Sequence, residues 1–190
     1  MESILKIISK SLSGDNKKTV LELGCGNGNL INAVAREFPN LEKIVAIDFY
    51  NEPKNLSSKV KFVKQDIENL NLDQTFDFVI INHVFEHIKN PLGLIERIKK
   101  ILNKNGRILI VVPNRKGFNN EARVYLPEHG KHYFLWDQES LQFSLERLGF
   151  TCRFHNLYGA GSHNLLLKYI PILLRIQNPN LTCVAMLENN

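Results

Sequence analysis

The segment from Thr19 to Leu30, TVLELGCGNGNL, constrains the fold more than any other part of the chain. A short apolar run ends at Glu22, and glycines follow at alternate positions, Gly24, Gly26 and Gly28. The apolar stretch that comes next is compatible with a helix, so the order predicts a strand, a tight turn and a helix N-terminus. Because glycine has no Cβ, such a turn lets a ligand approach the main chain. We also expect free backbone N–H groups of the turn to face that ligand.

Two acidic residues follow the next two predicted strands. Asp48 ends the apolar run KIVAID, and Asp66 directly follows the run VKFVKQ. In an open α/β sheet the ligand crevice lies beyond the carboxyl ends of the strands. Taken singly, the glycines could form a plain turn, and each acid could be a solvated residue at a strand end. The combination of one glycine turn with two strand-end acids indicates a nucleoside-binding site.

Strand-like and helix-like apolar runs alternate along the chain. The runs FDFVII and RILIVV are nearly continuous, which is typical of strands buried on both faces. Asn90 and Pro91 predict the cap and first position of a helix, PLGLIERIKKIL, and Asn105–Gly106 predicts the turn after it. Asp137 predicts the cap of a further helix, QESLQFSLERL, and Gly149 its C-terminal turn. This alternation predicts a mainly parallel α/β sheet with helices on both faces.

Length and composition favour a single domain over residues 1–190. Residues 1–18 are expected to form an amphipathic N-terminal helix, because lysines interrupt the apolar part as they would not in a signal peptide. No apolar run is long enough for a transmembrane helix. The three cysteines lie far apart, which fits a reducing compartment without disulfides or a cysteine zinc site. We therefore expect a cytoplasmic protein.

Two segments interrupt the alternation, residues 114–135 and residues 158–178. Long irregular insertions in compact domains are more often functional lids than accidents, so both are expected on the substrate side. The first is polar and aromatic, and the second is apolar. The second could form an acceptor wall, a membrane-surface contact or a packed helix. In and beside the first, four aromatic residues could line an acceptor pocket or cover the sheet edge: Tyr125, Tyr133, Phe134 and Trp136.

The net charge of +5 comes from lysines and arginines that are scattered along the chain. The clearest groups are short pairs such as Lys17–Lys18 and Lys99–Lys100. A solvated basic surface accounts for this distribution, whereas a nucleic-acid-binding face would need basic residues clustered in space. A nucleic-acid partner is therefore possible but not favoured.

Together these motifs resemble the class I S-adenosylmethionine-dependent methyltransferases. The resemblance runs from about Thr19 to Phe150, through LELGCGNG, the acid in AIDFY, the acid–apolar pair in KQDIENL, FDFVIINHVFEHIKNP and NKNGRILIVVPN. The last predicted strands, TCRFHNL and TCVAML, fit the same fold. The family implies a three-layer Rossmann-like sheet of seven strands, mostly parallel with an antiparallel last strand. It also implies S-adenosylmethionine as cofactor and S-adenosylhomocysteine as product.

The resemblance also implies how the first strand and its turn would hold the methionine end of the cofactor. Glu22 would face the cationic amino group through water, and Asn82 would offer its side-chain carbonyl to the same group. The residues whose backbone would pass beneath the cofactor are Gly24, Cys25, Gly26, Asn27 and Gly28.

The nucleoside end would lie against the next two strand ends. Asp48 would accept hydrogen bonds from both ribose hydroxyls, a fork that a carboxylate matches, and Phe49 beside it would belong to the same site. Asp66 would accept the adenine amino group, and Ile67 would pack on the adenine ring. These roles follow from the family resemblance.

The segment HVFEH, after the fourth predicted strand, would border the methyl group of the cofactor. His83 and His132 are the predicted general bases, with His129 as a further candidate. A sulfonium methyl group is already activated, so proximity and orientation supply much of the rate, and a base helps only where the acceptor holds a proton. Alternatively, Glu86 and His87 only begin the following helix and fix its N-terminus.

A divalent-metal site is another use of the same segment. Glu86 and His87, with His83 and His132, resemble the E-x-x-E-H pattern and later histidine of the small-RNA 3′-terminal 2′-O-methyltransferases. The ubiquinone-pathway O-methyltransferases carry a similar pattern. This chain has His83 where the first glutamate should be, so no metal is predicted. A metal-dependent RNA 2′-O-methyltransferase is kept as an alternative function.

Two other classes share part of the pattern. Rossmann dehydrogenases have a glycine turn and a strand-end acid, but the glycines here follow G-x-G-x-G and a second acid, Asp66, follows. A non-catalytic partner protein that binds S-adenosylmethionine would keep the same cofactor half. The prediction favoured here is methyl transfer to a hydroxyl, or second a nitrogen, of a small-molecule acceptor.

Overall fold

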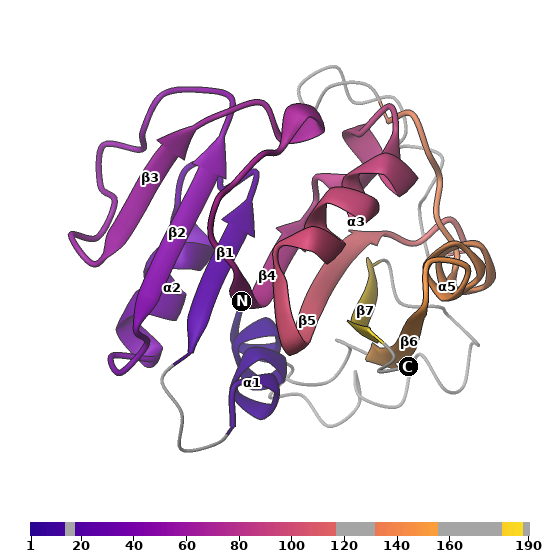
Figure 1. Cartoon of the computed structure of the whole chain (residues 1–190), viewed down its shortest axis with the longest axis horizontal. Coiled ribbons are helices and arrows are strands. Elements are labelled where there is room, and N and C mark those ends of the chain that lie inside the picture. Colours follow the sequence, from indigo (N-terminus) through magenta and orange to yellow (C-terminus); the bar gives the residue numbers. More distant parts are fainter. Residues whose placement is uncertain (14–17, 117–131, 156–179, 188–190) are drawn as a thin grey trace, which may run out of the picture.

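The computed structural model describes residues 1–13, 18–116, 132–155 and 180–187, which form a seven-stranded sheet with helices on both faces (Figure 1). The helices are α1 (Glu2–Ser11), α2 (Asn29–Glu37), α3 (Pro91–Lys100) and α5 (Gln138–Glu146). The short 3₁₀ helices are η1 (Ile67–Asn69) and η2 (Phe85–His87). The strands are β1 (Thr19–Leu23), β2 (Lys43–Asp48), β3 (Val60–Lys64), β4 (Phe76–Asn82), β5 (Leu102–Pro113), β6 (Phe150–His155) and β7 (Asn180–Leu187).

The strands lie in the order β3-β2-β1-β4-β5-β7-β6. Every neighbouring pair from β3 to β5 is parallel, whereas β7 runs antiparallel to both β5 and β6. The strand order reverses between β1 and β4, and open α/β sheets bind ligands at such a reversal, beyond the carboxyl ends of the strands. The predicted Rossmann-like sheet with an antiparallel last strand is confirmed.

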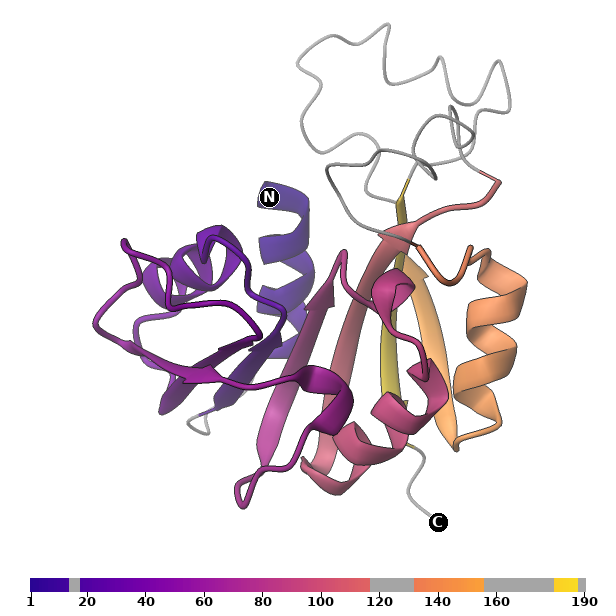
Figure 2. The same cartoon turned by 90° about the horizontal axis from the view of Figure 1, so that it is seen from above.

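Two apolar clusters fill the two faces of the sheet. On one face, Ile8 of α1 and Ile31 of α2 pack against β1, β2 and β4. On the other, Ile95 of α3 and Leu141 of α5 pack against the same central strands and β5. Figure 2 shows these helices on opposite sides of the sheet. The central strands are buried on both sides, as their nearly continuous apolar runs predict.

Two helices begin at the predicted caps. The Asn90 side chain accepts a hydrogen bond from a backbone N–H of α3, and Pro91 takes the first helical position. Asp137 forms a reciprocal capping box at the start of α5. These caps satisfy N–H groups that have no partner within the helix. α5 ends at Glu146, before the predicted end, and Gly149 closes its C-terminal turn with φ +83° and a 2.9 Å bond from its N–H to the Glu146 carbonyl.

The predicted helix after Pro91 was too long at its C-terminal end. Leu102 opens β5, where it pairs with Phe76 at the start of β4. The next pair along these strands is Phe78 with Arg107, so the extra residues of β5 bulge between the two pairs. The predicted turn residue Asn105 lies in this bulge with φ 64°. Leu102 has helical spacing, but a strand pairing from outside the local sequence decides its conformation.

Parts of the prediction fall on residues outside the described ranges. The predicted insertion 158–178 lies outside them, and the insertion 114–135 is described only at its two ends. Tyr125 and His129 are also outside. The N-terminal helix ends at Ser11 rather than running on towards the first strand. No described helix is both long enough and apolar enough to cross a membrane.

Candidate active site

The glycine turn joins the carboxyl end of β1 to α2. Gly24, Gly26 and Gly28 have φ values of +72°, +53° and +77°, a region that L side chains rarely adopt. A Cβ on Gly24 would collide with the side chain of Val84, and one on Gly28 would lie 3.1 Å from Leu56. A Cβ on Gly26 would meet no atom within 4 Å. The turn is therefore tightly packed at both ends and open at Gly26, where a ligand can lie over the backbone.

Several N–H groups of this turn are already hydrogen-bonded within the protein, which corrects the prediction that they are free for a ligand. Gly24 and Cys25 both donate to the Ile47 carbonyl, at 2.8 and 3.1 Å. The Gly26 N–H donates to Oδ2 of Asp48 at 2.8 Å. These bonds tie the turn to the end of β2 and fix its shape before any ligand binds.

Asp48 ends β2, where it is 7% exposed. Its Oδ2 accepts the bond from Gly26, and its Oδ1 accepts the Tyr50 N–H at 3.0 Å. Each carboxylate oxygen can accept a second hydrogen bond, so a diol could still bind. Phe49 and Tyr50 are strongly exposed and meet edge to face, with ring centroids 5.8 Å apart. The acid therefore lies beside an aromatic surface that a planar ring could use.

Asp66 caps η1 just after β3. Its Oδ1 accepts the Glu68 N–H at 2.9 Å, and its Oδ2 accepts the Asn69 side-chain amide at 3.0 Å. Ile67 is half-buried and packs against the core on the side of α3 and α5. The carboxylate thus shapes the 3₁₀ turn and keeps lone pairs that could accept a hydrogen bond from an amino group.

Glu22 and Asn82 place buried, unpartnered oxygens on the neighbouring strands β1 and β4. Glu22 is 2% exposed. Within the described chain, neither its Oε2 nor Oδ1 of Asn82 has a hydrogen-bond partner. Burial raises the pKa of Glu22 to about 8; the Ile31 N–H opposes this shift in part, and the charge of Asp48 adds to it. Unpaired buried acceptors are costly, and a ligand donor such as an ammonium group would relieve that cost.

Cys25 and Asn27 complete the turn without reactive side chains. Cys25 is buried, and its pKa is raised to about 12 by that burial and by the nearby charges of Glu22 and Asp48. The thiol therefore stays protonated and unreactive. Asn27 is exposed, and its Oδ1 accepts the Asn29 N–H at 3.2 Å at the start of α2. Both residues shape the backbone of the turn.

Polar side chains of the HVFEH segment converge just beyond β4. Glu86 is 2% exposed, its Oε1 lies 3.6 Å from Nδ1 of His83 and 4.0 Å from Nε2 of His87, and its Oε2 has no partner among the described residues. His83 has φ 55°, which is uncommon for a residue with a side chain. Backbone strain of this kind clusters at functional sites. Because Glu86 and His87 form η2 and α3 begins only at Pro91, the alternative in which they begin that helix is wrong.

His132 reaches the same carboxyl group from a distant part of the sequence. The rings of His132 and His87 meet edge to face with centroids 4.7 Å apart. The Glu86 carbonyl accepts the N–H groups of Tyr133 and Phe134 at 2.8 and 3.3 Å, which holds the segment in place. One ligand atom from each of Glu86, His87 and His132 lies within 4.8 Å of the others. These three side chains could therefore hold a metal ion, although the sequence predicted none.

Val84 and Trp136 have roles that the sequence did not reveal. The Val84 side chain packs against Gly24, so the HVFEH segment touches the glycine turn. Trp136 is 5% exposed, stacks on Phe85 with ring centroids 5.1 Å apart and packs within the core cluster. The sequence shows Val84 as an apolar residue within a polar segment, but it does not predict the contact of Val84 with Gly24.

Comparison with known proteins agrees with this geometry. The family described as "Methyltransferase domain" matches residues 2–153. The malonyl-[acyl-carrier protein] O-methyltransferase of Bacillus anthracis is 29% identical over 113 residues, which cover 56% of this chain and 42% of that protein. The ubiquinone biosynthesis O-methyltransferase of Rickettsia felis is 28% identical over 120 residues, 60% of this chain and 49% of that protein. The chain spans about half the length of these curated relatives.

Solved structures share the fold. The plantazolicin methyltransferase BpumL, in complex with a monoazolic desmethylPZN analogue and S-adenosylhomocysteine, aligns with a TM-score of 0.72 and 17% identity. The alignment covers 99% of this chain and 82% of that one. At this identity the likeness concerns the fold, and the family match covers the glycine turn, the strand-end acids and the HVFEH segment.

Proposed function

This chain belongs to the class I S-adenosylmethionine-dependent methyltransferases, and on that premise we propose that it methylates a hydroxyl oxygen, or second a nitrogen, of a small-molecule acceptor. The observation that carries the proposal is the cluster of His83, Glu86, His87 and His132 beside the glycine turn. A hydroxyl acceptor must lose a proton, and the cluster offers imidazole groups for that proton next to the cofactor site.

The residues around the turn fit the cofactor of the family. S-adenosylmethionine, when bound, supplies a methyl group that its sulfonium activates. The unpartnered oxygens of Glu22 and Asn82 suit its ammonium group, and the buried Asp48 keeps acceptor capacity for the ribose. The open face of Gly26 leaves room above the backbone. Asp66 and Ile67 would hold the adenine, with Phe49 close to Asp48.

His83 is the proposed general base, and His132 is the second candidate. The acceptor oxygen would form a bond to the methyl carbon as the carbon–sulfur bond breaks, and the electron pair of that bond would stay on sulfur. The hydroxyl proton would pass to the imidazole. The Glu86 carboxylate, 3.6 Å from Nδ1 of His83, would orient the ring and stabilise its protonated form, as the carboxylate does in a catalytic triad.

Substitution of each histidine by asparagine tests these roles, because asparagine tolerates the positive φ of His83 better than alanine does. We expect His83→Asn or His132→Asn to lower kcat by roughly 10²–10⁴-fold. The rise of the rate with pH that a general base produces should vanish. The acceptor substrate for this assay is first identified by a methyl-transfer screen of cell extract. As a control, the affinity of each variant for S-adenosylmethionine should stay unchanged. A normal rate and pH profile would exclude that histidine as the base.

Metal-dependent transfer is the second candidate function, and the convergence of Glu86, His87 and His132 within 4.8 Å favours it. A carboxylate with two imidazoles is a ligand set that divalent cations accept. In this case a chelator should abolish transfer, Mg²⁺, Mn²⁺ or Zn²⁺ should restore it, and Glu86→Gln should remove the response. A short RNA with a free 2′-hydroxyl at its 3′ end should be tested as acceptor. Full activity in the presence of chelator would rule this candidate out.

A further inference from the structure

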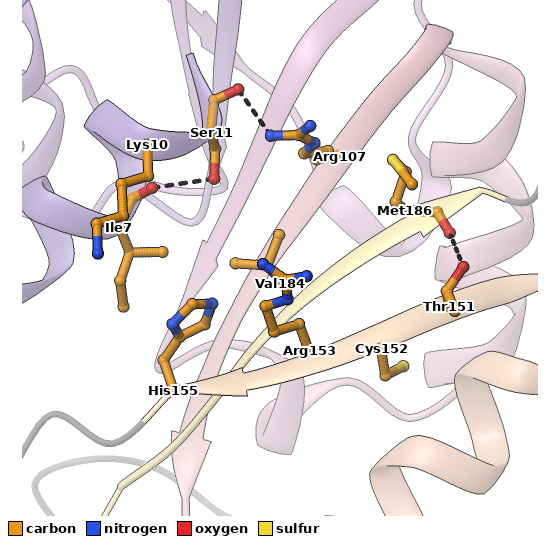
Figure 3. Close-up of a pocket in the computed structure, with 10 residues that line it drawn as sticks. All are labelled: Ile7, Lys10, Ser11, Arg107, Thr151, Cys152, Arg153, His155, Val184 and Met186. Carbon is orange, nitrogen blue, oxygen red and sulfur yellow. Dashed lines mark hydrogen bonds between the residues drawn. The ribbon is translucent and has the colours of Figure 1, made fainter. Parts of the chain in front are cut away.

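A cavity lies between α1 and the strands β5, β7 and β6. Its volume is about 330 Å³, and its lining includes Lys10, Arg107, Arg153 and His155 (Figure 3). Arg107 aligns across the sheet with Phe78 of β4, near the amino end of the parallel strands. The glycine turn follows the opposite, carboxyl end of β1. The described residues that line the cavity come from α1, β5, β6 and β7, and none comes from β1 or from the glycine turn, so the cavity is separate from the proposed cofactor site.

The alternation of β6 turns its polar residues towards this cavity. Phe150, Cys152 and Phe154 pack against the core on the side of α3 and α5. Thr151, Arg153 and His155 alternate with them, so they project from the other face, where the cavity lies. The edge strand β6 thus presents Arg153 and His155 on the face that α1 borders (Figure 3).

The charges of the cavity are not neutralised within the described chain. No aspartate or glutamate lines it, and none of the described ion pairs includes Lys10, Arg107 or Arg153. Nη1 of Arg107 donates to the Ser11 carbonyl at 3.1 Å, which fixes its guanidinium group at the wall. The pKa of His155 is lowered first by burial and then by the charges of Arg153 and Lys10. The cavity is thus a site of positive potential.

We propose that this cavity binds a phosphate group, carried by free phosphate or by a small phosphate ester. Guanidinium groups match the oxygens of a phosphate with paired N–H donors, and the ammonium of Lys10 adds a point charge. Ile7 and Val184 give the cavity an apolar wall that can contact the organic part of an ester. A volume of about 330 Å³ suits a small ligand that carries one phosphate group.

Titration calorimetry at constant ionic strength tests the site, with glycerol 3-phosphate and inorganic phosphate as probes. We expect saturable binding that Arg153→Gln and Lys10→Gln each weaken by at least about tenfold. Arg36→Gln, which removes an exposed arginine of α2 with the same change of charge, should bind as the unaltered protein does. Tighter binding of the ester than of phosphate identifies an ester as the ligand, and equal affinity identifies free phosphate; either supports the site.

Absence of binding for both probes, or equal affinity in the Arg153 and Lys10 variants, would overturn the proposal. Binding only of a short RNA oligonucleotide would also overturn it, in favour of a nucleic-acid face. S-adenosylmethionine affinity should stay unchanged in every variant, because the cavity lies apart from the glycine turn. If the cofactor assignment is wrong, the titration with S-adenosylmethionine will fail, while the titrations with phosphate and glycerol 3-phosphate will be unaffected.

Discussion

Glu22 shows at the scale of one residue how a binding site can lower stability. Burial raises its pKa from 4.5 to about 8. Between these values the folded protein keeps a proton that the unfolded chain has released. The contribution of Glu22 to the free energy of unfolding is therefore fully present below about pH 4.5 and is lost as the pH rises to about 8. An ammonium ligand beside the carboxylate would reverse the penalty, because it favours the charged form.

We predict that Glu22→Gln flattens this pH dependence. The variant should be more stable than the unaltered protein at pH 8, by on the order of a few kcal/mol, and close to it at pH 5. The same change should weaken S-adenosylmethionine binding, because it removes the charge that is proposed to face the ammonium group. Urea unfolding at the two pH values measures the first effect. Parallel stability profiles for the two proteins would show that Glu22 does not titrate as described.

The glycine turn is the element on which the proposed cofactor site rests, and Gly26 is its open point. Gly26→Ala would add a Cβ with no protein atom within 4 Å, so only backbone strain and the ligand can oppose it. Gly149→Ala is a matched control, since Gly149 also has positive φ, +83°, and only ordinary contacts near its Cβ position. Both changes should cost about 1–2 kcal/mol of stability.

Only Gly26→Ala should impair cofactor binding, and we expect at least a tenfold loss of S-adenosylmethionine affinity. Thermal unfolding of both variants checks that their losses of stability are similar, and calorimetry then compares their affinities. Equal affinities in the two variants would show that the ligand does not lie over Gly26.

The elements that hold the site were predictable where a local pattern decides them. Asp48 and Asp66 could be placed together because parallel strands share one carboxyl edge. Contacts between distant segments could not be read in the same way. The collision of a Cβ on Gly24 with Val84, and the two bonds to the Ile47 carbonyl, depend on how β1, β2 and β4 align. For the same reason the helical spacing of Leu102 predicts a helix, whereas its pairing with Phe76 of β4 makes it a strand residue.

At the scale of the whole molecule, the sheet separates two regions of different chemistry. Its carboxyl edge carries the glycine turn, the acids and the histidine cluster. Its other region, beside α1, gathers cations that the sequence scatters: Lys10, Arg107 and Arg153 come from α1, β5 and β6. The fold class could be predicted because alternating strands and helices allow few sheets. The basic cavity could not be predicted, because it depends on which face of β6 packs against the core and which face is turned towards α1.

Asp48 and Asp77 are a matched pair of acids for testing whether the carboxyl edge of β1 and β2 binds S-adenosylmethionine. Asp48→Ala removes a buried carboxylate that accepts two backbone N–H groups at that edge. Asp77→Ala removes a half-buried carboxylate that accepts the N–H and hydroxyl of Thr19 at the opposite end of the strands, at 2.8 and 2.9 Å. Both variants lose structural hydrogen bonds, but only one loses a proposed ligand contact.

The measurement is calorimetric titration of S-adenosylmethionine into the unaltered protein and both variants, each shown to be folded by circular dichroism. We expect saturable binding to one site, weakened by roughly 1.5–3 kcal/mol in Asp48→Ala and unchanged in Asp77→Ala. No binding to the unaltered protein, or an unchanged affinity in a folded Asp48→Ala variant, would contradict this expectation.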